Sequence, residues 1–300
     1  MLRLRNVSRT VMIAAAPAEN PTLADFLGQT YRMARPNCSD GQADQIGYAI
    51  TAIERWHGGT LRVADLSEPL LRGFLAAYSR TVSPATANSK RGHLLALWQC
   101  AWEEGLLAEP PRRAKVQRIT EPQRVPEAWT PAEMARILAA CDGTDRSAWW
   151  RSILLTAYDT GERRGALLAV SPADVDCDHQ WIVFRATKTK RQRWAQLSQQ
   201  AADAVAAILN PTSDRVWLWH GHLRECDREL SRILERAGVR YGRDAGGVWH
   251  KFRRTSGTLV EQAGGDGARH LGNSRAVFER CYRDPRFFHS SVDLLPRPTF

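Results

Sequence analysis

Residues 181–197 read Trp-Ile-Val-Phe-Arg-Ala-Thr-Lys-Thr-Lys-Arg-Gln-Arg-Trp-Ala-Gln-Leu, and this stretch decides the fold class. Its two ends, 181–185 and 194–197, are rich in β-branched and aromatic residues, which predicts the paired strands of a hairpin. Five basic residues and no acidic residue lie between positions 185 and 193. Such a hairpin is usually a solvated loop, but this run also suits a polyanion, and its candidate contacts are Lys190 and Arg191.

Helical periodicity surrounds the hairpin on both sides. Thr130-Pro131-Ala132-Glu133 is a capping box with proline at the first helical position, and apolar residues follow at helical spacing. Further helices are predicted over residues 147–160, 198–209, 222–237 and 250–263, with a short strand at Val216–Trp219. The sequence therefore predicts a mainly α fold with a small antiparallel β-sheet in its second half.

The first half of the chain is predicted to be wholly helical. Apolar residues recur at helical spacing in four segments between residues 22 and 110. The last of these helices is the clearest, because Ser83 is a good N-cap and Pro84 fits the first turn. Lys90 and Arg91 are placed on its polar side, where they are candidates for DNA binding or part of a solvated face.

Four segments are predicted along the chain. Residues 1–20 form a flexible basic arm, and residues 21–111 form the helical domain. Residues 112–128 contain several prolines and basic residues, which is typical of a basic linker. Residues 129–300 form the second, α+β domain, and the chain after Tyr282 reads as a tail because of its three prolines.

Composition narrows the class of partner. Lys plus Arg number 42 against 32 for Asp plus Glu, which gives a net charge of +10 and favours nucleic acid over a membrane surface. No apolar run reaches the ~18 residues that a membrane helix needs. The six cysteines are scattered without a C-x-x-C pair, which argues against a structural zinc site and suits the reducing cytoplasm. The sequence also lacks a phosphate-binding P-loop.

Five short motifs of the second half form an ordered set. They are Thr160-Gly161-Glu162-Arg163, the hairpin lysine Lys188, His250-Lys251-Phe252-Arg253, Leu271-Gly272-Asn273, and Tyr282 nine residues after Asn273. Taken singly, each motif is weak, because an arginine on a helix is more often structural and a tyrosine more often belongs to a core. Their joint order and spacing are the specific signal.

In this set the sequence resembles the tyrosine recombinase (phage integrase) family. The family's marks are a T-G-x-R turn, a hairpin lysine, an H-x-x-R helix start, an L-G-H turn and a tyrosine nine residues beyond that histidine. The specific resemblance covers residues 130–282, and residues 22–110 match only in character, as the family's helical core-binding domain. The resemblance implies site-specific cutting and rejoining of DNA through a 3′-phosphotyrosyl intermediate, without ATP or metal. It also implies a cytoplasmic, nucleoid-associated protein that acts as a homotetramer on paired sites in double-stranded DNA.

Residue chemistry fits the roles that the resemblance implies. Arg163 and Arg253 suit a phosphate clamp, because guanidinium groups bind phosphate oxygens bidentately and stay charged. Tyr282 is the expected nucleophile, and ionising a phenol at pH 7 costs about 4 kcal/mol unless cations lie nearby. Lys188 is expected to protonate the departing 5′-oxygen, and His250 is expected to assist proton transfer.

Two positions depart from the family's pattern. Asn273 stands where the family has histidine or tryptophan, and asparagine donates a hydrogen bond but carries neither charge nor proton. His270 lies three residues earlier, so on a helix it would share a face with Asn273 and take the missing role. Ala166 stands where the family usually has an acidic residue. These departures leave open a slow or inactive enzyme.

Other functions remain as alternatives. The main one is a catalytically impaired, integrase-derived protein that still grips DNA. A type IB topoisomerase-like enzyme would share the tyrosine chemistry, whereas an RNA-binding protein is poorly supported because no stacking aromatic motif is present. The tail after Tyr282 is expected to dock on a neighbouring protomer.

Overall fold

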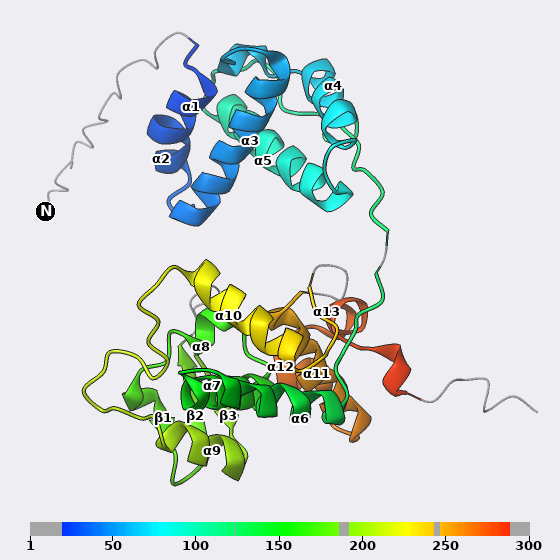
Figure 1. Ribbon diagram of the computed structural model, residues 1–300. Helices are drawn as coiled ribbons and strands as arrows, with labels where there is room; N and C mark the ends of the chain where they lie inside the picture. Colours follow the sequence, from blue (N-terminus) through cyan, green and yellow to red (C-terminus); the bar gives the residue numbers. More distant parts are fainter. Residues whose placement is uncertain (1–19, 123, 186–191, 243–246, 289–300) are drawn as a thin grey trace, which may run out of the picture. The chain divides into compact units, whose positions relative to one another are not determined.

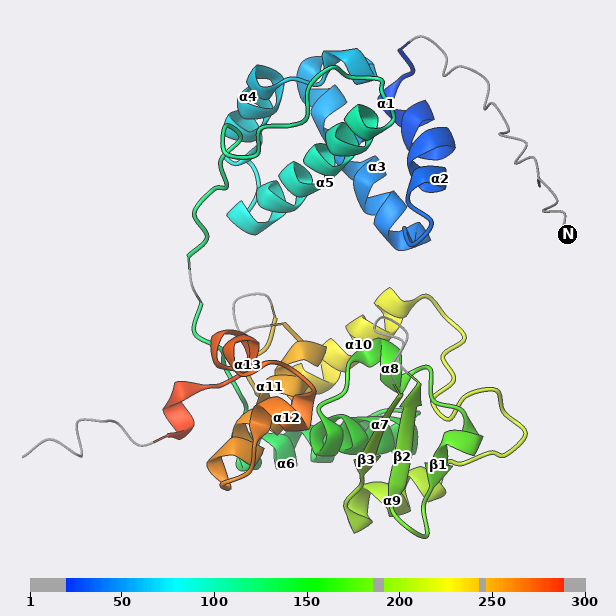
Figure 2. The same ribbon diagram turned by 180° about the vertical axis from the view of Figure 1, so that it is seen from behind.

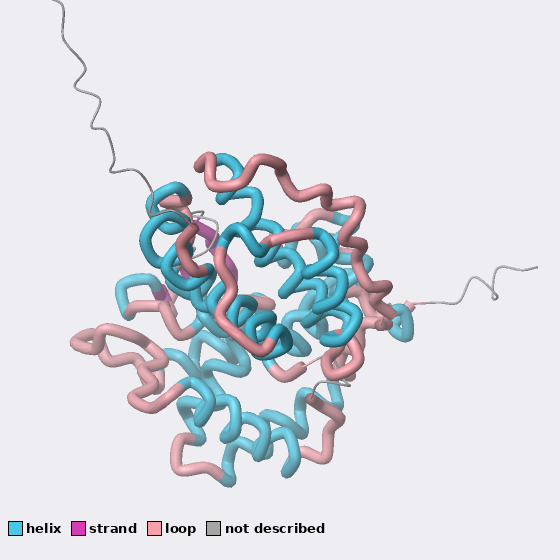
Figure 3. Tube along the Cα trace, turned by 90° about the horizontal axis from the view of Figure 1, so that it is seen from above, coloured by secondary structure: helices cyan, strands magenta, loops and turns pink. Residues whose placement is uncertain are grey.

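The computed structural model describes residues 20–122, 124–185, 192–242 and 247–288. The chain divides into two compact units, Met1–Gln123 and Arg124–Phe300. Helices and loops make up most of both units, and strands occur in one place only among the described residues (Figure 3). A mainly α fold with a small sheet is therefore confirmed. None of the helices in these ranges is both long and apolar enough to span a membrane.

The first unit contains the four predicted helical segments (Figure 1). They are α1 (Leu23–Asp25) with the π-helical turn Phe26–Tyr31 and α2 (Arg32–Ala34), then α3 (Asp40–His57), α4 (Glu68–Tyr78) and α5 (Pro84–Glu103). Ser83 caps α5 as predicted, because its side chain accepts the N–H of Thr86. The predicted apolar stripe of α5 is buried and packs against α3 and α4.

Most of the segment predicted as a linker is bound to one unit or the other. Val116 is fully buried in the core of the first unit. Asn88 of α5 donates to Ile119 O at 2.8 Å and accepts its N–H at 2.9 Å. Ala128 and Trp129 are buried in the second unit. The two units divide between Gln123 and Arg124, inside the predicted linker.

The prediction that Lys90 lies on a polar, solvated face is wrong. Its side chain is only 8% exposed, its Nζ lies 5.5 Å from the centroid of the Tyr48 ring, and burial lowers its pKa. Arg91 donates to Val116 O at 2.6 Å and to Arg113 O at 3.0 Å. The physical reason is that Lys90 lies against Tyr48 of α3, while the segment after α5 returns over the helix and binds Arg91. A DNA contact by either residue stays a prediction.

Asn88→Ala is expected to destabilise the first unit by about 1–3 kcal/mol, because it leaves the half-buried N–H of Ile119 without its acceptor. Urea denaturation of the full chain measures this change in the transition of the first unit. The exposed Gln42→Ala is the control, with an expected change below about 0.5 kcal/mol. A loss for Asn88→Ala no larger than that of the control would show that the segment is not held by this side chain.

The second unit places a three-stranded sheet among helices (Figures 1 and 2). Its helices are α6 (Pro131–Ala140), α7 (Ser147–Thr160), α8 (Arg164–Leu167), α9 (Gln199–Ala206), α10 (Leu223–Arg236), α11 (Trp249–Gln262), α12 (Gly267–Leu271) and α13 (Arg275–Cys281). The strands β1 (Val175–Asp176), β2 (Trp181–Arg185) and β3 (Gln192–Gln196) pair antiparallel in that order. The predicted hairpin and the capping box at Thr130 are confirmed.

Two strand predictions need correction. Residues Val216–Trp219 form a turn and no strand, because Val216 donates to Val170 O while the indole N–H of Trp217 donates to Ser152 Oγ inside the core. Their apolar character reflects packing of isolated side chains. Strand β1 was not predicted, because two residues are too short to show an alternating pattern.

The described part of the sheet packs its apolar face on the helical core. Ile182, Phe184 and Ala195 are buried together with residues of α7 and α9. Helix α11 lies against both α7 and α12. This arrangement brings the end of α7, the start of α11 and the turn after α12 together, and these are three of the five predicted motifs.

Candidate active site

A glycine turn at the end of α7 builds the first part of the site. Gly161 has φ of 60° and ends α7 in the left-handed conformation, which glycine adopts without steric cost. A Cβ at this position would lie 2.4 Å from Leu271 Cδ2, so only glycine lets the turn approach α12 this closely. Arg163 follows as the N-cap residue of α8, and its side chain is exposed.

Arg253 on α11 joins three of the predicted motifs. Its side chain is 1% exposed, and its guanidinium donates to Gly161 O at 2.6 Å, to Leu271 O and, at 3.4 Å, to Asn273 Oδ1. Its Nε finds no acceptor among the described residues. Burial and then the positive charge of Arg163 lower the pKa of Arg253. The two cations are therefore close together, as a clamp for one anion requires.

The side-chain amide of Asn273 is bonded to the guanidinium of Arg253. Because its Oδ1 accepts from Arg253, its Nδ2 is the free end of the amide, and this buried atom has no acceptor within the described ranges. Two residues that contact one another, Arg253 and Asn273, thus each carry a buried donor that has no acceptor in the part of the chain that the structure describes. Buried donors of this kind call for an acceptor such as a phosphate oxygen.

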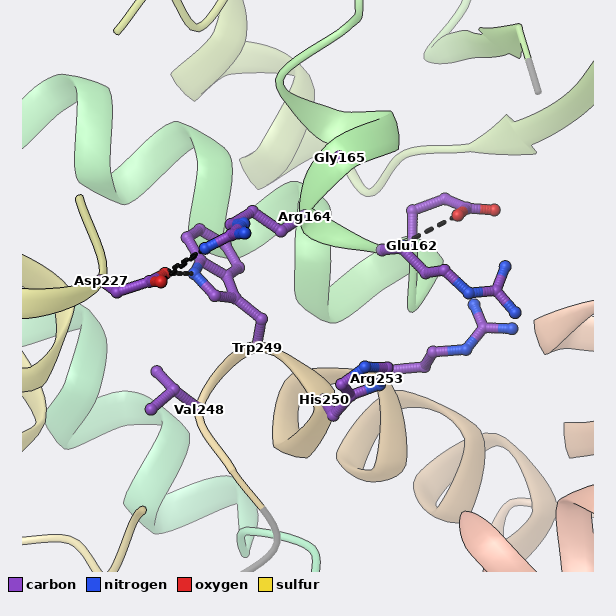
Figure 4. A pocket seen from close by; sticks show the side chains of 9 residues that line it. Glu162, Arg164, Gly165, Asp227, Val248, Trp249, His250 and Arg253 are labelled. Atoms are coloured by element: carbon purple, nitrogen blue, oxygen red, sulfur yellow. Dashed lines mark hydrogen bonds and ion pairs between the residues drawn. The ribbon is translucent and has the colours of Figure 1, made fainter. Parts of the chain in front are cut away.

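A pocket of about 460 Å³ opens beside these groups, lined by Glu162, Arg163, Arg164, Gly165, Asp227, Val248, Trp249, His250 and Arg253. Figure 4 shows His250 and Arg253 extending from α11 toward the turn that carries Glu162. Removal of water from part of the His250 ring and the charges of nearby arginines lower its pKa, so the ring is neutral at pH 7. A neutral imidazole can accept a proton.

The start of α11 is held in place by an ion pair. Arg164 of α8 binds both carboxylate oxygens of Asp227 on α10, at 2.5 and 2.6 Å. The indole N–H of Trp249 donates to Asp227 Oδ1 at 3.0 Å (Figure 4). Since Trp249 directly precedes His250, this network fixes where the imidazole enters the pocket.

Tyr282 lies at the same site within the same chain. The centroid of its ring is 5.2 Å from the guanidinium carbon of Arg253. The ring packs against Ala268, Leu271 and Phe278. The structure therefore brings Arg163, His250, Arg253, Asn273 and Tyr282 together, although up to 119 positions separate them in the sequence.

His270 does not join this group. Its Nε2 lies 2.7 Å from Ser256 Oγ, and the ring lines a different pocket, with Arg193 and Trp194. Burial and the charges of Arg193 and Arg253 lower the pKa of His270 to about 4. The structure thus places Asn273, and not His270, on the guanidinium of Arg253.

The depressed pKa of His270 predicts an acid-sensitive fold. An unfolded histidine titrates near pH 6.5, so between about pH 6.5 and 4 the unfolded state binds a proton that the folded state does not. The stabilisation is complete above pH 6.5 and is lost as the pH falls toward 4, by at most about 3 kcal/mol. Urea unfolding between pH 4 and 7 should show a flatter profile for His270→Gln. An unchanged profile would contradict this assignment.

Sequence reasoning missed a buried ion pair under the Arg163 turn. Glu162 is 8% exposed, binds Arg193 Nη1 of β3, and accepts the backbone N–H of Arg163 at 2.9 Å. Arg193 also donates to Thr160 O at 3.0 Å and to His270 O. The absence of an acid at position 166 is therefore accompanied by a buried carboxylate at position 162. Glu162 is part of the T-G-x-R motif, but its burial leaves no mark in the sequence.

Lys188, Lys190 and Arg191 lie outside the described residues. The strands that flank them are described, and Arg185 pairs with Gln192 at the last register position of β2 and β3. The roles predicted for these three residues stay predictions.

The chain is similar to known DNA-acting proteins. The sequence model of the phage integrase family matches residues 127–268. A search of curated proteins gives no match. A lambda integrase dimer bound to a COC′ core site is 19% identical, with a TM-score of 0.69 over 89% of this chain and 79% of that chain.

Two further structures share the fold. A lambda integrase tetramer bound to a Holliday junction is 19% identical, with a TM-score of 0.71 over 90% of this chain and 80% of that chain. The Tn1549 transposon integrase in complex with a circular intermediate DNA is 14% identical, with a TM-score of 0.68 over 91% and 97%. Residues 127–268 thus match the phage integrase family, and the chain shares the fold of these integrases.

Proposed function

We propose that this protein is a site-specific DNA recombinase that cuts and rejoins DNA strands through a 3′-phosphotyrosyl intermediate. The observation that carries this proposal is Arg253, whose buried guanidinium touches the Gly161 turn and the Asn273 turn and lies beside the ring of Tyr282. The lambda integrase dimer and tetramer and the Tn1549 integrase, which share the fold, are bound to DNA. The partner is therefore double-stranded DNA, bound by a homotetramer.

In the proposed reaction, the phenol oxygen of Tyr282 attacks the phosphorus atom, and the bond from phosphorus to the 5′-oxygen breaks. The phenol proton goes to His250, which is neutral at pH 7, and the 5′-oxygen takes a proton from Lys188. Arg163, Arg253 and the amide of Asn273 bind the non-bridging oxygens. A 5′-hydroxyl then attacks the phosphotyrosine, so the bond energy is retained and strands are exchanged.

The cations beside Tyr282 suit the charge that develops in the proposed reaction. The guanidinium carbon of Arg253 lies 5.2 Å from the centroid of the Tyr282 ring, and Arg163 lies close enough to lower the pKa of Arg253. Both groups would stabilise the negative charge that builds up on the phosphate oxygens during attack. The proposed site therefore combines nucleophile and clamp.

A second candidate, a DNA-binding protein with impaired catalysis, is favoured by one observation. Asn273 stands where the family has histidine or tryptophan and can carry neither charge nor a proton, and His270 is held by Ser256. Covalent trapping separates the two functions. Nicked suicide duplexes with a randomised core are incubated with the full chain, and adducts that resist SDS are selected. The recombinase yields enriched adducts, whereas binding without any adduct would support the second candidate.

A further inference from the structure

The segment after Tyr282 is bound to the residues with which the second unit begins. The carboxylate of Asp284 is fully buried and accepts the N–H of Ala128 at 2.7 Å. Arg286 binds the same carboxylate at 2.6 Å and donates to Ala128 O at 3.3 Å. Burial alone would raise the pKa of Asp284, but the bonds from Arg286 and Ala128 hold it below its usual value, so the carboxylate is ionised at neutral pH. The chain after Tyr282 thus starts with an anchored turn, and residues 289–300 of the predicted tail lie outside the described range.

Helix α11 holds the backbone of the tyrosine from the other side. The buried hydroxyl of Thr258 donates to Tyr282 O at 3.0 Å and accepts the N–H of Asp284 at 3.1 Å. Thr258 lies five residues after Arg253 on the same helix. The backbone at Tyr282 is therefore bonded directly to α11, the helix that carries Arg253.

The residues that Asp284 binds are themselves fixed on α11. The N–H of Trp129 donates to the buried Thr255 Oγ1 at 2.9 Å. Lys251 donates to Arg240 O at 2.9 Å, and its Nζ lies 3.6 Å from Glu127. Asp284 is thus bonded to a segment that is itself bonded to α11, and Thr258 of the same helix binds the backbone of both Tyr282 and Asp284.

We propose that Asp284 is a positioning residue for Tyr282, which holds the phenol in the active site of its own chain. This inference rests on the proposed function, in which Tyr282 is the nucleophile. Helix α13 has seven residues and ends directly before Tyr282, so the anchor that follows decides how the ring is presented. Without it, the ring samples more orientations, and a misplacement of about 1 Å lowers a rate by about 10²-fold.

The test compares single-turnover cleavage of a nicked suicide duplex by the full-chain variants Asp284→Ala and Asp284→Asn. Asp284→Ala should cleave about 10–100-fold more slowly at saturating DNA, with DNA affinity within about twofold of the natural protein. Asp284→Asn should recover part of the rate, because its amide oxygen still accepts the N–H of Ala128. Val205→Ala in α9 is the control for stability, since it removes buried methyl groups far from this segment in the sequence.

Rate and amplitude separate positioning from folding. Loss of folded protein lowers the amplitude of adduct formation, whereas poor positioning lowers its rate constant. A normal rate constant for Asp284→Ala, with a loss of amplitude like that of Val205→Ala, would overturn the inference and leave the proposed function intact. A natural protein that binds the duplex but forms no adduct would instead count against the proposed function.

A mixture of two variants tests delivery within one chain. Arg163→Ala lacks a clamp residue but keeps the tyrosine, and Tyr282→Phe lacks the nucleophile but keeps the clamp. If Asp284 holds the tyrosine at its own clamp, the mixture forms adduct no faster than Arg163→Ala alone. Faster adduct formation by the mixture would show delivery to a neighbouring copy and overturn the inference.

Discussion

Replacing Arg253 with alanine is expected to lower the rate of DNA cleavage by about 10²–10³-fold or more. The guanidinium is buried and bonded to Gly161 O, Leu271 O and Asn273 Oδ1. Its loss leaves these three acceptors without their partner and, in the proposed mechanism, also removes a donor to the phosphate. Single-turnover adduct formation on a nicked suicide duplex measures the effect. The exposed ion-pair residue Arg151 gives the control, and Arg151→Ala should cleave within about twofold of the natural protein.

Arg253→Lys separates charge from geometry. Lysine keeps the positive charge, but one ammonium group cannot reach the acceptors that the planar guanidinium bridges. Cleavage by Arg253→Lys should therefore be at least about 10-fold slower than cleavage by the natural protein. The melting temperature of the variant shows whether it is folded. Cleavage at the natural rate by the lysine variant would mean that the bridging geometry does not matter.

Tyr282→Phe is expected to abolish the covalent adduct while leaving DNA affinity within about twofold. The ring packs against Ala268, Leu271 and Phe278, and phenylalanine preserves these contacts, so the fold should be retained. In the proposed mechanism the hydroxyl forms the bond to phosphorus, and its loss cannot be compensated by binding. SDS gels of the trapped complex measure the adduct.

Tyr241→Phe is the matched control for this change. The hydroxyl of Tyr241 donates to Glu235 and lies among exposed groups, so its loss should leave the adduct yield unchanged. A Tyr282→Phe protein that still forms adduct would show that another residue is the nucleophile.

The order of motifs predicted which residues meet, but not how they are held. Thr160–Arg163, His250–Arg253 and Tyr282 were recognisable because each stands at an element end where glycine, capping or spacing restricts the residue type. In the structure Arg253 bonds to Gly161 O and Asn273 Oδ1, and the roles predicted for these residues stay predictions. The choice between Asn273 and His270 depended on side-chain direction, which a helical repeat does not fix when the helix has only five residues.

Long-range polar contacts were beyond sequence reasoning. Lys90 looks like a surface lysine, but it is buried and lies against the ring of Tyr48 on α3. The pairs Glu162–Arg193 and Asp284–Ala128 join residues 31 and 156 positions apart. No local pattern records such pairs, because each member has the composition of an ordinary turn or strand end. The residues directly after Tyr282 were predicted to be a tail, but Asp284 is buried and bonded to Ala128, a contact that no local pattern records.

Identification of the modified residue in the trapped adduct tests the central claim most directly. The adduct is digested with nuclease and protease, and the peptide that carries the residual nucleotide is sequenced by mass spectrometry. The proposed mechanism predicts a phosphodiester on the hydroxyl of Tyr282, linked to a 3′-oxygen and leaving a free 5′-hydroxyl on the cut strand. A nucleotide on any other side chain, or a 5′-linked adduct, would contradict the proposed mechanism.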